Sequence, residues 1–276
     1  MRTSEQIKAE IEDKFGFFPP FFSPAQPHPQ ILENLWQQTL SAYVTNPLPT
    51  LFKEKLSAYL SRYCLVPYCM VCHSCSLYSL GMKATQVLKL LESAPPIEEI
   101  QSNKHLRVLK TFPEKLNLLS ELDSALEEGL LYCCALTFLG KDANCSYRNE
   151  LHRLLGVENY QHLVALIAYV KACHAWMEAY PEVAYNYTAD KRSQDHLHSL
   201  LGEAPALADF FHQYREIVNH ECQSQAEQQA QLRTKAVEAA NQELESDLSE
   251  HKQALEALQK QAVMLREQAQ LLDLAR

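Results

Sequence analysis

Residues 206–276 contain neither glycine nor proline, the two residues that most strongly interrupt a helix. From Leu244 onward, a seam of mostly apolar residues recurs with alternating spacings of four and three. Its members are Leu244, Leu248, His251, Leu255, Leu258, Ala262, Leu265, Ala269 and Leu272. A sustained heptad repeat with polar neighbours predicts a coiled coil. Because a single polar helix of this length is only marginally stable, the seam also predicts a partner chain.

A second copy of the same chain fits this seam. Asn241 occupies the same heptad position as Leu248, and a buried asparagine there favours one register and a two-stranded state. We therefore expect a parallel homodimer through the tail. Neither glycine nor proline stops the helix before Arg276, so we expect the natural chain to continue into a further domain.

The composition favours helix and limits the classes of partner. Six glycines in 276 residues, with few alternating β-branched segments, predict an all-α protein. A net charge of −9 offers no basic surface for nucleic acid. There is no uncharged apolar stretch of about 20 residues, so we expect no membrane span. Nine cysteines without an N-terminal export signal are typical of thiols in a reducing cytoplasm.

A chemical motif lies between Glu54 and His73. Pro67 predicts the start of a helix, because proline often occupies the first helical position. Cys69 then lies in the first turn, where unpaired N–H groups and the positive end of the helix dipole favour a thiolate. His73 shares its face one turn later. We predict Cys69 as a nucleophile of lowered pKa, His73 as the base and Glu54 as the group that orients the imidazole.

These residues resemble the alkylhydroperoxidase D (AhpD) and carboxymuconolactone decarboxylase superfamily. The motif of that superfamily is a glutamate, a spacer, Cys-x-x-Cys and, after three residues, a histidine. Glu54, Cys69 and His73 match it, and the similarity extends over residues 10–185. The resemblance implies an AhpD-like helical domain and thiol peroxidase chemistry. It departs from the family at Val66, which stands where the family has its first cysteine.

A peroxidase cycle needs a second thiol to resolve the sulfenic acid, and Val66 cannot supply it. Cys72, three residues after Cys69, and Cys64 are the candidate resolving thiols. A Cys69–Cys72 pair inside a regular helix is strained. Loss of the peroxidase cycle is the favoured interpretation.

Metal binding is an alternative use of the same segment. Cys69, Cys72, His73 and Cys75 include zinc-type ligands, and Cys173 or His174 could add a distant one. Structural zinc sites usually draw on two separate segments. We therefore expect no metal here, and no bound cofactor. The remaining cysteines are interpreted as structural thiols: Cys133, Cys134, Cys145, Cys173 and Cys222.

The chain is expected to divide into an AhpD-like helical domain at 1–203 and a coiled-coil signalling helix at 204–276. The apolar run within 159–180 predicts a helix buried on nearly all sides. Residues 97–113 are expected to be less regular, and residues 182–203 to connect the domain to the tail.

Two functions of different classes follow. In the first, a degenerate AhpD-like domain is a sensory or interaction module, and the coiled coil transmits its state to an output domain. The segment 265–276 resembles the linker that leads into PAS domains of sensor histidine kinases, which implies an output domain of that kind. In the second, the protein is a thiol-dependent alkylhydroperoxidase that uses Cys69 and His73.

Overall fold

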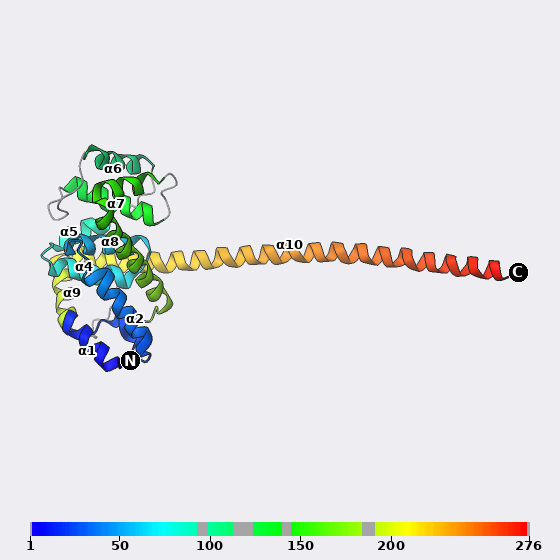
Figure 1. Cartoon of the computed structure of the whole chain (residues 1–276), viewed down its shortest axis with the longest axis horizontal. Helices are drawn as coiled ribbons and strands as arrows, with labels where there is room; N and C mark the ends of the chain where they lie inside the picture. The colour runs from blue at the N-terminus through cyan, green and yellow to red at the C-terminus, as the bar shows by residue number, and fades with distance from the viewer. Residues whose placement is uncertain (1, 93–98, 113–123, 140–144, 184–190, 275–276) are drawn as a thin grey trace. The chain divides into compact units, whose positions relative to one another are not determined.

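The computed structural model describes residues 2–92, 99–112, 124–139, 145–183 and 191–274. Within these ranges all regular secondary structure is helical, which confirms the all-α class (Figure 1). The helices of the first half are α1 (Ser4–Phe15), η1 (Pro20–Ala25), α2 (Pro29–Thr39), η2 (Leu40–Val44), α3 (Thr50–Tyr63), α4 (Pro67–Ser79) and α5 (Ala84–Glu92). They are followed by α6 (Glu99–Thr111), α7 (Ser124–Phe138), α8 (Ser146–Ala179), α9 (Lys191–Glu203) and α10 (Pro205–Leu274).

The chain forms two compact units, Met1–Arg215 and Glu216–Arg276. The first unit contains α1 to α9 and the first turns of α10, so it extends beyond the predicted boundary at 203. Across the described residues, none of the helices combines the length and apolar character that crossing a membrane demands.

Two segments that the sequence predicts as irregular contain helices. α9 occupies much of the predicted connection, where Leu197 and Leu200 are buried among polar neighbours. α6 occupies part of 97–113, with Leu106 and Leu109 buried one turn apart. Both predictions were wrong because two apolar contacts in a polar segment give a weak periodic pattern. Tertiary packing stabilises such helices more than propensity does.

The corner between α3 and α4 carries the predicted motif. Val66 N–H donates to the carbonyl of Ser61 at 3.1 Å, across a left-handed Leu65 with φ of 59°. This is a Schellman-type closure of α3. Pro67 begins α4 immediately afterwards, as predicted. The two helices therefore pack side by side, with Glu54 on one and His73 on the other.

The described residues of the first unit include two hydrophobic clusters. One joins α3, α7 and α8, and includes Phe52, Leu130 and Leu166. The other joins α1, η1, α2, α4 and α8. The phenylalanine-rich segment before α2 packs into this second cluster, with Phe21 and Phe22 buried.

The helix α8 contributes to both clusters, and it changes direction at Gly156, whose φ of 70° and ψ of 172° are not helical. Residues on both sides of Gly156, from Leu151 to Val170, pack into the first cluster, and Cys173 and Met177 pack into the second. The part of α8 after Gly156 buries only one of its faces. Small residues are exposed on the opposite face. These exposed residues are Ala165, Ala168, Ala172 and Ala175. The prediction of burial on nearly all sides was therefore wrong, because alanine is apolar in composition but equally compatible with a surface.

Candidate functional site

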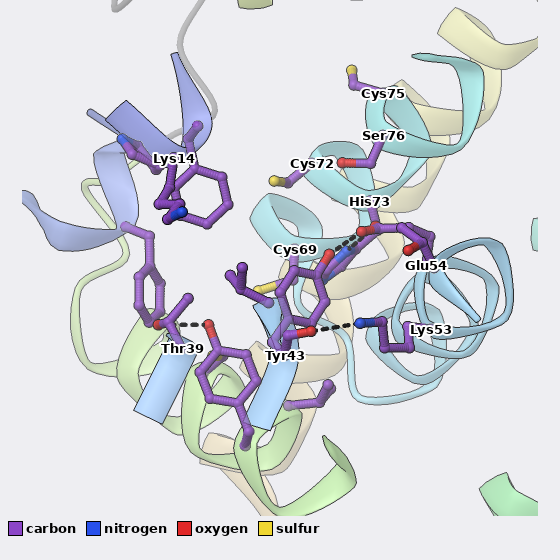
Figure 2. A pocket seen from close by; sticks show the side chains of 18 of the residues that line it. Lys14, Thr39, Tyr43, Lys53, Glu54, Cys69, Cys72, His73, Cys75 and Ser76 are labelled. Carbon is purple, nitrogen blue, oxygen red and sulfur yellow. Dashed lines mark hydrogen bonds and ion pairs between the residues drawn. The ribbon is translucent and has the colours of Figure 1, made fainter. Parts of the chain in front are cut away.

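A cavity of about 700 Å³ opens at the motif. It is lined by the end of α1 and by residues of η1, α2, η2, α3, α4 and α8 (Figure 2). Aromatic side chains dominate its apolar wall: Phe15, Phe17, Phe21, Phe22, Tyr43, Tyr68 and Tyr169. Its volume lies in the range of sites that enclose a small organic molecule.

Glu54 organises the polar end of the cavity. Its Oε2 accepts a hydrogen bond from His73 Nδ1 at 2.8 Å, and its Oε1 accepts one from the hydroxyl of Tyr43. Figure 2 shows these three side chains converging. Because Nδ1–H donates to the carboxylate, Nε2 is the nitrogen of His73 that can accept a proton. The structure thus brings together the predicted base and its orienting acid.

Tyr43 is a member of this network that the sequence does not reveal. It lies in η2, in an apolar segment that offers no motif. Burial, and then the charge of Glu54, raise the pKa of Tyr43 well above its usual range, so the hydroxyl stays protonated and donates. Lys53 fixes its backbone, donating to the carbonyl of Tyr43 at 2.6 Å and to that of Asn46 at 2.9 Å.

Cys69 lies in the first turn of α4 and lines the cavity, as expected, but its predicted low pKa is wrong. The residue is only 5% exposed, and burial raises the pKa of its thiol well above the ordinary value. A helix N-terminus stabilises an anion by about 0.3–1 kcal/mol. Full desolvation shifts a pKa by up to about 3–5 units, which is several times larger. At Cys69 desolvation therefore outweighs the helix dipole.

The two candidate resolving thiols differ in position. Cys72 lines the same cavity, and burial followed by the charge of Glu54 raises the pKa of its thiol. Cys64 ends α3 and packs against the second cluster, and burial raises its pKa too. Cys69 and Cys72 are three positions apart in a regular helix, where Cβ atoms lie about 5–6 Å apart. A disulfide needs about 3.5–4.5 Å, so this pair cannot join without unwinding α4.

The helix α8 supplies the opposite wall with Tyr169, Cys173 and His174. The Thr39 hydroxyl donates to Leu35, so it accepts the hydrogen bond from the Tyr169 hydroxyl at 2.9 Å. Burial raises the pKa of Cys173 to about 12. The sequence placed Cys173 among structural thiols. Its spacing of four from Tyr169 was the available signal that both share a face.

His174 is held as a neutral imidazole. The Ser61 hydroxyl donates to the carbonyl of Ser57 at 2.7 Å, so it must accept from His174 Nε2–H at 2.9 Å. Its Nδ1 is buried and has no hydrogen-bond partner among the described residues. Burial, and then the charges of His73 and Lys171, lower the pKa of His174 to about 4.

Among the described residues, no group of three or more His, Cys, Asp or Glu is arranged to hold a metal ion. Among the described residues no cysteine forms a disulfide; these cysteines are Cys64, Cys69, Cys72, Cys75, Cys133, Cys134, Cys145 and Cys173. No family model matches this chain, and no significant similarity to a curated protein or to a solved structure was found. The resemblance to AhpD proteins therefore stays a prediction from the sequence.

Proposed function

We propose that the N-terminal unit is a sensory module built on a degenerate AhpD-like domain. The helix α10 then carries its state to an output domain of the PAS or histidine kinase type. The observation that carries this proposal is the attachment of α10 to α3, the helix that bears Glu54. The hydroxyl of Tyr214 donates to the carbonyl oxygens of Ser61 at 3.2 Å and Arg62 at 2.8 Å.

Ser61 connects this attachment to the cavity. Its hydroxyl accepts from His174, while its carbonyl accepts from Tyr214. The guanidinium of Arg62 also stacks on the ring of Tyr214, with its central carbon 4.7 Å from the ring centroid. A displacement of α8 or of the α3 C-terminus therefore changes contacts made by the first turns of α10. This is the physical link that a sensory role requires.

The second unit supports the same proposal through its seam. Leu244, Leu248, Leu255 and Leu258 are 58–71% exposed on the single chain. Leucines at this spacing gain most by packing against a second helix. A parallel homodimer places both C-termini at one end, where paired output domains could receive the signal.

The coupling is tested by removing the charge at Glu54. We expect Glu54→Gln to weaken the contacts of His73 and Tyr43 and to speed hydrogen exchange in residues 205–215. Glu127→Gln is the matched control. It removes an ion pair of 2.7 Å to Lys55, which lies next to Glu54 on α3. Hydrogen exchange in 205–215 that is unchanged by Glu54→Gln, although exchange around His73 responds, would contradict the sensory proposal.

A thiol peroxidase is the second candidate, favoured by the ordered Glu54–His73 pair beside the thiols of Cys69 and Cys72. In this case Val66→Cys should raise the turnover of a hydroperoxide with a dithiol reductant, and Cys69→Ala should abolish it. Robust turnover by the wild-type protein that survives Cys72→Ala and Cys64→Ala would favour the enzyme over the degenerate site.

A further inference from the structure

Four thiols from two helices line one cavity. Cys69, Cys72 and Cys75 come from α4, and Cys173 comes from α8. Figure 2 shows the sulfurs of Cys69 and Cys72 directed away from the axis of α4. Cys69 and Cys173 belong to the same buried cluster and are 5% and 9% exposed. The cavity therefore brings the Cys173 thiol of α8 together with the thiols of α4, and Cys69 shares its buried cluster.

Cys173 is better placed than Cys72 to form a disulfide with Cys69. The regular helical spacing to Cys72 is too long for a disulfide. Cys69 and Cys173 lie in the same buried cluster, and the interaction with Cys173 follows burial among the causes that raise the pKa of Cys69. α4 and α8 are in direct contact, so the two thiols lie on neighbouring helices.

We infer that a hydroperoxide entering the cavity converts Cys69 and Cys173 into a reversible disulfide, so that α8 supplies the second thiol that Val66 does not. This inference rests on the proposed sensory function and names the chemical class of its signal. The stimulus is an alkyl hydroperoxide or hydrogen peroxide, and the output of the site is a covalent tie between α4 and α8.

The steps balance without a further reactant. The Cys69 sulfur attacks the terminal oxygen of ROOH, the O–O bond breaks, and the thiol proton passes to the departing alkoxide to give ROH. This leaves Cys69 as a sulfenic acid. The Cys173 sulfur then attacks the Cys69 sulfur, and the hydroxide that leaves takes the Cys173 proton to form water. In sum, two thiols and ROOH give one disulfide, ROH and water.

The surroundings set the speed of this reaction. Burial raises the pKa of Cys69 well above its usual range and that of Cys173 to about 12. Because the thiolate is the nucleophile, oxidation is slow at neutral pH and quickens by roughly tenfold per pH unit below the pKa. His73 lines the same cavity, and its Nε2 can relay the proton of Cys69 to the departing alkoxide. A slow, stoichiometric response suits a sensor of sustained peroxide better than a turnover enzyme.

The test uses the full chain and cumene hydroperoxide at about pH 9, where thiolate is more abundant. After free thiols are blocked, non-reducing peptide mapping should find the Cys69 and Cys173 peptides joined, with the loss of two hydrogens. Dithiothreitol should separate them. Cys72→Ala is the matched control and should retain the linked peptide. Cys173→Ala should lose it and should accumulate a Cys69 sulfenic acid, seen as a several-fold gain in dimedone labelling.

A disulfide from Cys69 to Cys72 or Cys64 would overturn the inference. So would the absence of any disulfide, or equal dimedone labelling of Cys69 in the wild-type chain and in Cys173→Ala. The mapping of the wild-type protein decides the matter even if a variant folds poorly. A linked peptide without transmission to residues 205–215 contradicts the sensory function alone. Transmission without the linked peptide contradicts only this inference.

Discussion

A desolvated thiol reacts slowly, and this gives Cys69 a measurable property at the scale of a single residue. We expect iodoacetamide at pH 7 to label Cys69 more slowly than Cys145, because Cys145 is partly exposed and Cys69 is buried with a raised pKa. Peptide mapping against time measures both rates in one sample. Faster labelling of Cys69 than of Cys145 would contradict the raised pKa of Cys69. It would support the activated nucleophile that the first-turn position predicts.

His174 predicts a pH dependence of stability. Its folded pKa of about 4 lies below the ordinary 6.5. Above about pH 6.5 the imidazole is neutral in both states. Between 6.5 and 4 the unfolded chain takes up a proton that the folded chain does not, so the free energy of unfolding falls as the pH falls. Below 4 both states are protonated and the loss levels off. The full loss is roughly 3 kcal/mol.

The measurement is urea unfolding at pH 7 and at pH 4 for the wild-type chain and for His174→Gln. The glutamine amide can still donate to Ser61 but does not titrate. The difference between the two pH values should therefore shrink in His174→Gln. His152→Gln, at an exposed position of the same helix, should leave it unchanged. Equal pH dependence in the wild-type chain and His174→Gln would show that His174 is protonated as easily when folded as when unfolded.

At the scale of elements, the end of the motif helix depends on Gly81. Its φ is +91°, and an added Cβ would meet nothing within 4 Å. Gly81→Ala should therefore lower the free energy of unfolding by about 1–2 kcal/mol through backbone strain alone. Gly202, inside α9, also has open space but no such φ. Gly202→Ala should instead raise the free energy of unfolding, by up to about 1 kcal/mol. Thermal or urea unfolding of the two variants measures this contrast.

Helices with strong local signals could be predicted from the sequence, whereas contacts between distant segments could not. Pro67 and the Cys69–His73 spacing located α4. The Glu54–His73 contact could be predicted because the two residues lie on consecutive helices, α3 and α4. Tyr43 reaches the site from η2, a nearby segment without a motif, and Cys173 reaches it from α8, far along the chain. The pKa of Cys69 also escaped prediction, because burial is a property of the packed domain.

At the scale of the whole molecule, the seam predicts a parallel dimer. We expect a photo-reactive benzoyl-phenylalanine in place of Leu258 to cross-link two chains, because Leu258 faces the partner at a seam position and is 62% exposed in the single chain. Lys260, an exposed position on the opposite side of the heptad, is the matched control and should cross-link little. Photo-cross-linking leaves the native cysteines in place.

Two outcomes would contradict this arrangement. Equal cross-linking from both positions indicates random collision between chains rather than a seam. A cross-linked product that joins Leu258 of one chain to the region of Asn241 in the other indicates an antiparallel pair, which suits an oligomeric enzyme better than a relay to paired output domains. Mapping of the cross-linked peptides by mass spectrometry distinguishes these products from the parallel one.

The position of Ser61 has a consequence for the order in which the protein acquires its site during synthesis. Its hydroxyl is bonded to a residue 113 positions later, and its carbonyl to one 153 positions later. A ribosome translating at about 5–20 residues per second releases these partners only several seconds after α3 has emerged. The nascent chain thus holds Glu54, Cys69 and His73 for that interval without the wall that desolvates them. The thiol of Cys69 and the imidazole of His73 are most open to solvent, and to chemical damage, before α8 has been synthesised.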